Sequence, residues 1–484
     1  MTPINTLPDD ALLEIFDFYM KFSQHDKIST VYFCGTSNVS KEEIEAWQTL
    51  VHVCRLWRNI VFGSPRRLNL RLVCTPETPL SNVQDIWPAL PLCIHDCMEY
   101  PTKSAYDIIA AFGHDRICQL LIRRCKWWEL GELWAAMQVP FPELTVLDIN
   151  PFDPFQGTPV IPDSFLGGSA PRLRSLYLFR IPFPGLPKLL SSATHLVTLR
   201  LCEIPISGYI SPESMANCLS VLTSLHDLII LFKPDQYLPD RETRRLSPPI
   251  RSVLPALTEF DFGGNNEYLE DLIARIDLPR LKNLRIVFPE QTHYEISQLL
   301  QLISRTPSFD RPEKAILDFN FYNFGITLLS QRPGTGVLTV KILNVRPYRF
   351  TDQEVLALAR VCTSALPLLS AVENLFFCEP ELFEAKWEDN IEGAPWLELL
   401  RLFTTVKNLY LSEKCEPRVV LALQKLVEES RTMEVLPTLE SLFLWGSGPV
   451  HEGVERFVTA RQLTSPIVVL RWDGLFEQGQ YNLW

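Results

Sequence analysis

Three potential metal ligands alternate in residues 91–97, which read PLCIHDC. Cys93, His95 and Cys97 would lie on one face of a strand, and zinc prefers thiolate and imidazole ligands. Side chains on one face of a straight strand lie ~6.6 Å apart, which is too far for easy tetrahedral coordination, and a fourth ligand is not evident. We therefore expect buried thiols beside a hydrogen-bonded histidine and no metal.

Other catalytic patterns are equally weak. Residues 261–263 spell the Asp-Phe-Gly tripeptide of kinases, but no HRD-type catalytic loop precedes them. The chain has no GxGxxG, P-loop, HExxH, GxSxG or paired CxxC motif. Carboxylate pairs such as Asp9-Asp10 lie at predicted helix starts, where the helix dipole favours negative charge. The sequence predicts no catalytic residue, no cofactor and no enzymatic activity.

Composition describes a folded protein that does not bind nucleic acid. The 484 residues include 45 Lys plus Arg and 57 Asp plus Glu, giving a net charge of -12, and 46% are hydrophobic. A polyanion-binding protein would show a basic stripe. The N-terminus carries acids and no basic signal-peptide region, no run approaches the ~18 apolar residues of a membrane helix, and the 12 cysteines form no paired framework. We expect a cytoplasmic or nuclear protein without a membrane partner.

A short apolar pattern recurs from about residue 115 onward. An apolar residue is followed by another three positions on and by a third two positions further. Successive copies start 21 to 35 residues apart, which is the spacing of solenoid repeats. Twelve copies start at Leu144, Leu173, Leu196, Leu225, Leu257, Leu281, Ile316, Val337, Val372, Val406, Leu439 and Ile467, and a thirteenth is plausible at Ile117.

Helix signals separate these predicted strands. Capping boxes are expected at Thr292 with Glu295 and at Thr351 with Glu354, and Ser211 precedes a proline suited to the first helical position. Each strand-helix unit buries its apolar surfaces only by stacking on its neighbours. Residues 76–484 thus resemble a degenerate leucine-rich-repeat solenoid. The resemblance implies an α/β fold of right-handed turns, with a parallel sheet on the concave side and helices outside.

Residues 1–75 carry helical periodicity instead. Apolar residues Leu12, Ile15, Phe16 and Tyr19 share one face of a first helix. A second helix is expected to begin at Ser40, with Glu43 completing a capping box. Its apolar stripe would run without interruption through Trp47, Leu50, Val51, Cys54, Trp57 and Val61, leaving Arg55 and Arg58 near the rim.

Two separated blocks in this segment resemble the F-box, whose motif has the form LPxxxLxxIF followed by VCRxWR. The spacing between the blocks is longer than is usual, which suggests an insertion near residues 21–38. Together with the repeats, and with stretches such as WPALPLCIHD, DSFLGGSAPRL and SGYISPE, the chain is similar to the large F-box families of mushroom-forming fungi. The matching residues are Leu7, Pro8, Leu12, Ile15, Phe16, Val53, Cys54, Arg55, Trp57, Arg58 and Pro65.

The resemblance implies a substrate-recognition subunit of a cullin-RING ubiquitin ligase. The F-box would dock on a Skp-type adaptor and through it on a cullin, while the repeats would bind a client protein. The rival interpretation is a non-catalytic interaction scaffold whose F-box-like segment no longer recruits a ligase. The adaptor-binding residues would be Leu7, Pro8, Leu12, Ile15, Phe16, Val53, Cys54 and Trp57.

The client is expected at the concave face. The middle concave position of each strand would be Asp148, Tyr177, Arg200, Ile229, Asp261, Arg285, Asn320, Lys341, Phe376, Tyr410, Phe443 and Arg471. Because adjacent strands lie ~4.8 Å apart, the three consecutive aromatics should stack as a ladder, with Trp445 at its edge. We expect Tyr177, Phe376, Tyr410, Phe443 and Trp445 to contact the client. The alternative is that the C-terminal tail, with Phe476, Tyr481 and Trp484, covers the ladder.

Overall fold

The computed structural model is a mixed α/β protein whose large sheet is mostly parallel. The part of the chain that it describes separates into two compact units, which meet in the sequence at Thr198 and Leu199. The described residues are 7–25, 44–75, 77–78, 89–96, 105–123, 125–151, 159–233, 251–289, 294, 296–319, 323–330, 332, 334–343, 349–350, 352–364, 366–378, 386–387, 393–412, 415–446, 449–462 and 464–472.

The first unit begins with a helical segment and continues as a parallel sheet. Strands β1 to β5 pair in chain order, and the leucines of the repeated pattern align between neighbours, as in Leu147 with Leu176. Both leucines are fully buried, which confirms the predicted frame of these repeats. The elements are α1 (Asp9–His25), α3 (Trp47–Val51), α4 (Arg55–Gly63), β1 (Leu72–Cys74), β2 (Leu92–Asp96), α6 (Ala105–Phe112), β3 (Ile117–Arg123), α7 (Leu130–Ala136), β4 (Val146–Asn150), β5 (Ser175–Phe179) and α8 (Leu186–Leu190).

The predicted uninterrupted second helix is wrong. The chain leaves the helix after Val51, and Cys54 adopts an extended conformation at φ -159° and ψ 171°. Its thiol accepts a bond from the Trp57 amide at 3.5 Å and so caps the start of α4. A local side chain that bonds the backbone competes with helix continuation, and periodicity alone does not detect this. The predicted capping box at Ser40 and Glu43 lies outside the described residues.

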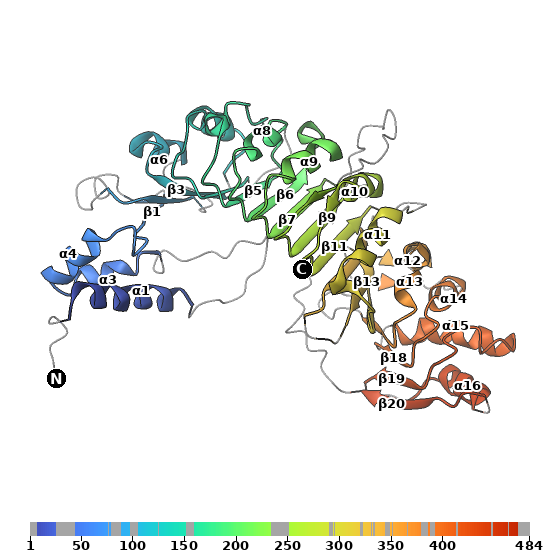
Figure 1. Ribbon diagram of the computed structural model, residues 1–484. Coiled ribbons are helices and arrows are strands. Elements are labelled where there is room, and N and C mark those ends of the chain that lie inside the picture. The colour runs from blue at the N-terminus through green and yellow to red at the C-terminus, as the bar shows by residue number, and fades with distance from the viewer. Residues whose placement is uncertain are drawn as a thin grey trace. The chain divides into compact units, whose positions relative to one another are not determined.

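The second unit carries the remaining strands, with helices between several of them. In Figure 1 the helices α9 to α16 lie along one side of its sheet. The elements are β6 (Thr198–Ile204), α9 (Pro212–Leu219), β7 (Asp227–Phe232), β8 (Ser252–Val253), β9 (Glu259–Gly263), α10 (Asn266–Ile273), β10 (Ile276–Asp277), β11 (Asn283–Phe288), α11 (Ser297–Arg305), β12 (Lys314–Phe319), β13 (Asn323–Leu329), β14 (Val337–Leu343), β15 (Arg349–Phe350), α12 (Asp352–Ser364), α13 (Leu366–Leu369), β16 (Asn374–Cys378), β17 (Lys386–Trp387), α14 (Ala394–Leu400), β18 (Asn408–Leu411), α15 (Glu416–Glu428), β19 (Ser441–Trp445), α16 (Glu452–Arg461) and β20 (Val468–Trp472).

Strand order in this unit departs from chain order at one place. The strands run β6-β7-β9-β11-β14-β13-β12-β16-β18-β19-β20, and β13 is antiparallel to both of its neighbours. The expected order, with β12 before β14, is therefore wrong. The short connections on either side of β13 permit only antiparallel neighbours, and the order of β12, β13 and β14 in the sheet is the reverse of their order in the chain.

The predicted frame also fails in three strands. Pairing aligns Ile316 with Phe376, Thr339 with Arg285, and Leu470 with Phe443. The predicted middle position is two residues too far along in β14, four too far in β12 and one too far in β20, because these strands carry apolar residues on both faces and the pattern fits more than one frame. The middle residues are Ile316, Thr339 and Leu470, in place of the predicted Asn320, Lys341 and Arg471, of which Asn320 lies outside the described residues.

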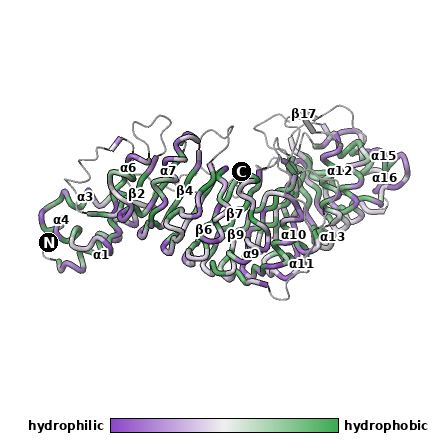
Figure 2. The backbone as a smooth tube through the Cα atoms, turned by 90° about the horizontal axis from the view of Figure 1, so that it is seen from above, coloured by the Kyte–Doolittle hydropathy of each residue, from purple (hydrophilic) through white to green (hydrophobic). Residues whose placement is uncertain are grey.

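Contacts with helices identify the two faces of the second unit's sheet. Trp396 of α14 lies 5.8 Å from the rings of both Phe319 and Phe377, and Tyr268 of α10 stacks on Phe262 at 5.9 Å. The opposite face of the sheet is termed the helix-free face below. Apolar and polar stretches alternate along the backbone of both units, as expected of strands and helices that bury one side (Figure 2).

Helix starts follow the predicted rules where they are described. Ser211 accepts a hydrogen bond from the Ser214 amide at 3.2 Å, which confirms the predicted cap of α9. The start of α11 is instead held from another repeat, because the Glu270 carboxylate accepts bonds from the Gln298 and Leu299 amides at 2.7 and 2.9 Å. Thr292, Glu295 and Thr351 of the two predicted capping boxes lie outside the described residues.

Candidate partner-binding surfaces

Two predicted adaptor-binding residues form the core of the helical segment. Leu12 and Phe16 of α1 are fully buried, and the Phe16 ring lies 4.7 Å from that of Trp57 on α4. The segment is joined to the first strand, since the Trp47 indole donates to the Arg71 carbonyl at 2.9 Å. These contacts make Leu12 and Phe16 structural residues of the segment.

The other predicted contacts divide between solvent and the helix junction. Leu7 and Pro8 are exposed ahead of α1, Ile15 is 42% exposed and Val53 is 56% exposed. Cys54 caps α4, as described above. Exposed apolar side chains are common one at a time, but a group of them on a small segment indicates a binding surface.

Sequence reasoning missed two members of this group. Phe18 on α1 is 71% exposed and Leu56 on α4 is 39% exposed. Each is a large apolar residue that lies off the predicted inward stripe. This position could have identified both residues as exposed apolar side chains. The five exposed apolar residues, termed the helical-segment group, are Leu7, Ile15, Phe18, Val53 and Leu56.

Cys54, Trp57 and Arg58 of the second block make contacts at the junction between α3 and α4. Trp57 is half-buried on Phe16, and its indole nitrogen is buried without a hydrogen-bond partner in the described part of the chain. Arg58 donates to the Val51 carbonyl at 3.0 Å and so satisfies an acceptor at the end of α3. Arg58 is exposed, as its predicted rim position implies, and it also makes this structural contact.

The predicted aromatic ladder is confirmed on the helix-free face. Phe376 and Tyr410 stack with centroids 4.0 Å apart and planes 7° from parallel, and Tyr410 stacks on Phe443 at 4.3 Å and 8°. Strand pairing extends this row at both ends, to Ile316 of β12 and Leu470 of β20. We term these five side chains the aromatic row.

The aromatic row is more exposed at its β20 end. Phe376 is 8% exposed beneath the ammonium of Lys314, which lies 4.3 Å from the ring centroid. Tyr410 and Phe443 are half-buried, and burial raises the pKa of the Tyr410 phenol. Leu470 is 42% exposed. An apolar surface that opens in this way suits an interface with another protein.

The other two predicted client contacts lie in different settings. Trp445 is half-buried on β19 and pairs in register with Trp472. Tyr177 lies on β5 in the first unit and is only 2% exposed, so it does not offer its ring to solvent. The tail residues that could cover the ladder, Phe476, Tyr481 and Trp484, lie outside the described residues.

The candidate zinc ligands do not form a described metal site. Cys93 is buried with its sulfur 3.7 Å from that of Cys118, and Cys97 lies outside the described residues. Burial and then the nearby Arg123 charge lower the pKa of His95, and its Nε2 has no hydrogen-bond partner among the described residues. In the described ranges no three His, Cys, Asp or Glu residues gather as ligands.

Asp261, the first residue of the kinase-like tripeptide, lies on the helix-free face of β9. The pKa of its carboxyl is raised to about 6, chiefly by burial and to a lesser extent by the charges of Asp227 and Glu259, while Arg285 and Arg200 oppose the rise. It pairs in register with Ile229 and Arg285. The Asp261 carboxyl is therefore a titratable group within the sheet.

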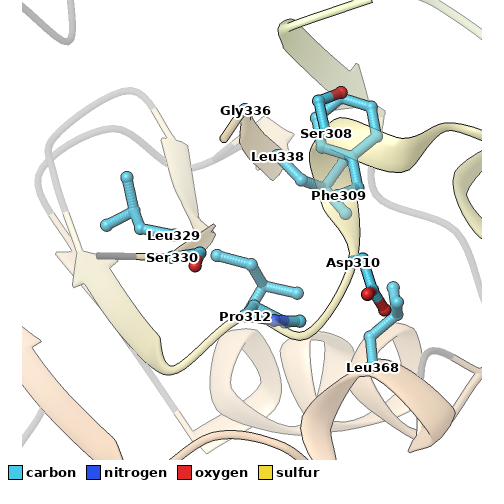
Figure 3. A pocket seen from close by; sticks show the side chains of 10 residues that line it. Ser308, Phe309, Asp310, Pro312, Leu329, Ser330, Gly336, Leu338 and Leu368 are labelled. Carbon is cyan, nitrogen blue, oxygen red and sulfur yellow. The ribbon is translucent and has the colours of Figure 1, made fainter. Parts of the chain in front are cut away.

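Two hollows in the described part of the second unit are poorly suited to small ligands. Figure 3 shows one where Phe309, Pro312 and Leu338 converge, and its volume is about 10 Å³, too small for more than a single water. A wider open hollow of about 820 Å³ adjoins it and is lined by charged groups such as Arg332, which lies 3.6 Å from Glu313. Neither has the enclosed apolar walls of a small-molecule site.

A scan of the chain against protein-family models finds no match, and a search of curated proteins finds no similar sequence. Along the described ranges, no helix combines the length and the apolar character needed to cross a bilayer.

Proposed function

We propose that the chain is the non-catalytic substrate-recognition subunit of a Skp-cullin-F-box ubiquitin ligase. The supporting observation is the division of apolar residues in the helical segment. Leu12 and Phe16 hold the segment together from inside, while Ile15, Phe18 and Val53 remain exposed. The exposed members would dock on a Skp-type adaptor, because apolar surface of this kind is stabilised by burial against a partner.

The repeats would form a leucine-rich-repeat-like solenoid that holds a client protein. Parallel strands in chain order with buried leucines in register support this architecture. The aromatic row would supply the contact surface, since aromatic side chains dominate the energetics of protein interfaces. Ubiquitin transfer would be performed by other subunits.

Co-purification with a Skp-type adaptor tests ligase membership. The full chain should retain the adaptor, and the double variant Leu7→Ala/Pro8→Ala should retain less of it. A matched control is Val221→Asp, which alters a residue that is 39% exposed in the second unit and outside both proposed surfaces. Undiminished retention by the double variant would count against the assigned docking residues.

The alternative is a repeat scaffold that does not recruit a ligase. It predicts no adaptor in the purified complex while client binding persists. Affinity purification from native cells with the proteasome blocked separates the two functions, since a ligase subunit should bring down adaptor, cullin and client together.

Client binding is tested with Phe443→Ala and Leu470→Asp on the aromatic row. Both should reduce the client recovered while leaving adaptor recovery unchanged, because Phe443 and Leu470 belong to the second unit and the helical segment belongs to the first. Recovery of the same client in equal amount by both variants would place the client site elsewhere.

A further inference from the structure

Two buried cysteines lie side by side on neighbouring strands of the first unit. The sulfur atoms of Cys93 on β2 and Cys118 on β3 are 3.7 Å apart. The pairing of the strands shifts at this point, because Leu92 pairs with Ile117 whereas Cys93 pairs with Gln119. Cys118 is therefore the extra residue of a bulge, and bulges re-aim a side chain. Neighbouring strands lie ~4.8 Å apart, which is within the backbone separation that a disulfide requires.

The two thiols are chemically unequal. The hydrogen bond with Cys118 is the main cause that raises the pKa of Cys93, and the same bond lowers the pKa of Cys118. Burial opposes this fall in the pKa of Cys118, and the guanidinium of Arg71 adds to it; the Cys118 thiol also donates to the Leu92 carbonyl at 3.3 Å. Cys118 is thus the better thiolate of the pair, and the thiolate is the nucleophile in thiol oxidation.

We propose that Cys93 and Cys118 form a reversible dithiol–disulfide pair that is oxidised by hydrogen peroxide. The Cys118 thiolate attacks one peroxide oxygen, the O–O bond breaks, and Cys118 becomes a sulfenic acid with release of hydroxide. The Cys93 sulfur then attacks the Cys118 sulfur, the S–O bond breaks, and the disulfide forms with release of water. Two electrons pass from the two thiols to the peroxide, and a dithiol reductant reverses the change.

The position of the pair links this chemistry to the helical segment. Cys93 and Cys118 share one buried cluster with Ile44, which precedes α3 of that segment, and with Val73 of β1. The Val73 amide also donates to the Glu45 carboxylate at 2.8 Å. Closing the sulfur separation from 3.7 Å to a bond of ~2.05 Å must move atoms against which Ile44 packs. Oxidation of the pair therefore shifts residues that attach the helical segment to the sheet.

The experiment is a thiol map of the full chain after treatment with graded hydrogen peroxide. Free thiols are alkylated, the chain is digested without reductant, and the peptides are identified by mass spectrometry. The expected product is the Cys93–Cys118 cross-linked peptide, which disappears after dithiothreitol. Cys362 serves as an internal control, because burial raises its pKa to about 12 and it should stay reduced.

Two variants assign the roles. In Cys93→Ser, Cys118 should accumulate as a sulfenic acid that dimedone traps. In Cys118→Ser, Cys93 should remain reduced at the same peroxide concentration. The proposal is overturned if both cysteines of the unaltered chain stay reduced after half-exposed Cys54 has been oxidised, or if either cross-links to a different cysteine. The map of the unaltered chain decides the matter even where a variant fails to fold.

Discussion

Lys341 on β14 reaches Asp318 on β12 across the intervening strand β13. The ammonium lies 3.0 Å from the carboxylate, and the lysine is only 1% exposed. Strand pairing places Gly325 between them. A methyl group at Gly325 would lie 2.3 Å from the Val340 carbonyl oxygen and 2.8 Å from Lys341. The glycine thus leaves the space through which the lysine side chain passes, and the ion pair joins the three strands whose order is reversed.

Asp318→Ala should destabilise the fold strongly. Removal of one partner leaves a buried ammonium without its counter-charge, which typically costs about 3–5 kcal/mol. The measurement is the free energy of unfolding by urea. The double variant Asp318→Leu/Lys341→Met should recover most of the loss, because it buries no charge. A single variant as stable as the unaltered chain would contradict the structural role of the pair.

Gly325→Ala should lower stability by about 1–3 kcal/mol, because the added methyl group must displace backbone atoms of β14. The thermal unfolding midpoint measures the effect. Gly63→Ala is the matched control, since nothing lies within 4 Å of the added methyl group there and the midpoint should stay level or rise. Equal midpoints for the two alanine variants would be evidence against the close packing at Gly325.

Much of the sheet could be predicted from the sequence, because the repeat pattern marks strand interiors directly. The leucine positions Leu147 and Leu176 and the stacked rings of Phe376 and Tyr410 follow from counting residues along the repeats. The reversed order of β12, β13 and β14 could not be predicted in this way. It depends on hairpin connections and on Gly325, and β13 carries no copy of the repeat.

The helical segment shows a second limit. Apolar spacing favoured one continuous helix through Cys54, but the first helix ends at Val51 and the Cys54 thiol accepts a bond from the Trp57 amide at the start of α4. Periodicity reports which residues are apolar, but it does not report where a polar atom competes for the backbone. The exposed Phe18 and Leu56 were missed for a related reason. Helical periodicity selects the apolar residues that share one stripe and passes over those that lie off it.

Stability should fall as pH rises through the titration of Asp261. Its pKa is raised to about 6 in the folded chain from an ordinary value of 3.8, so the folded state binds the proton more tightly than the unfolded state does. The resulting penalty is absent below about pH 4 and complete above about pH 6, and it amounts to at most about 3 kcal/mol. Unfolding free energies measured from pH 4 to 7 should show the decline, and Asp261→Asn should flatten it. An unchanged slope in the variant would assign the titration to another group.

Tyr410→Ala should remove both ring contacts of the aromatic row. Each stacked pair contributes about 0.5–1.5 kcal/mol beyond the area it buries, so the loss should be about 1–3 kcal/mol in the free energy of unfolding by urea. Tyr410→Phe should retain most of it, because the stacked ring remains. Equal destabilisation by both changes would show that the hydroxyl, and not the stacking, stabilises this face.

Direct titration of the full chain with a purified Skp-type adaptor tests the central claim, which is that exposed apolar residues of the helical segment recruit a ligase. We predict binding at micromolar concentration or tighter, and a weakening of roughly 30-fold or more when Ile15→Asp and Val53→Asp are combined. Val221→Asp should bind like the unaltered chain. Absence of binding by the unaltered chain at micromolar concentration, or equal affinities for all three proteins, would contradict it.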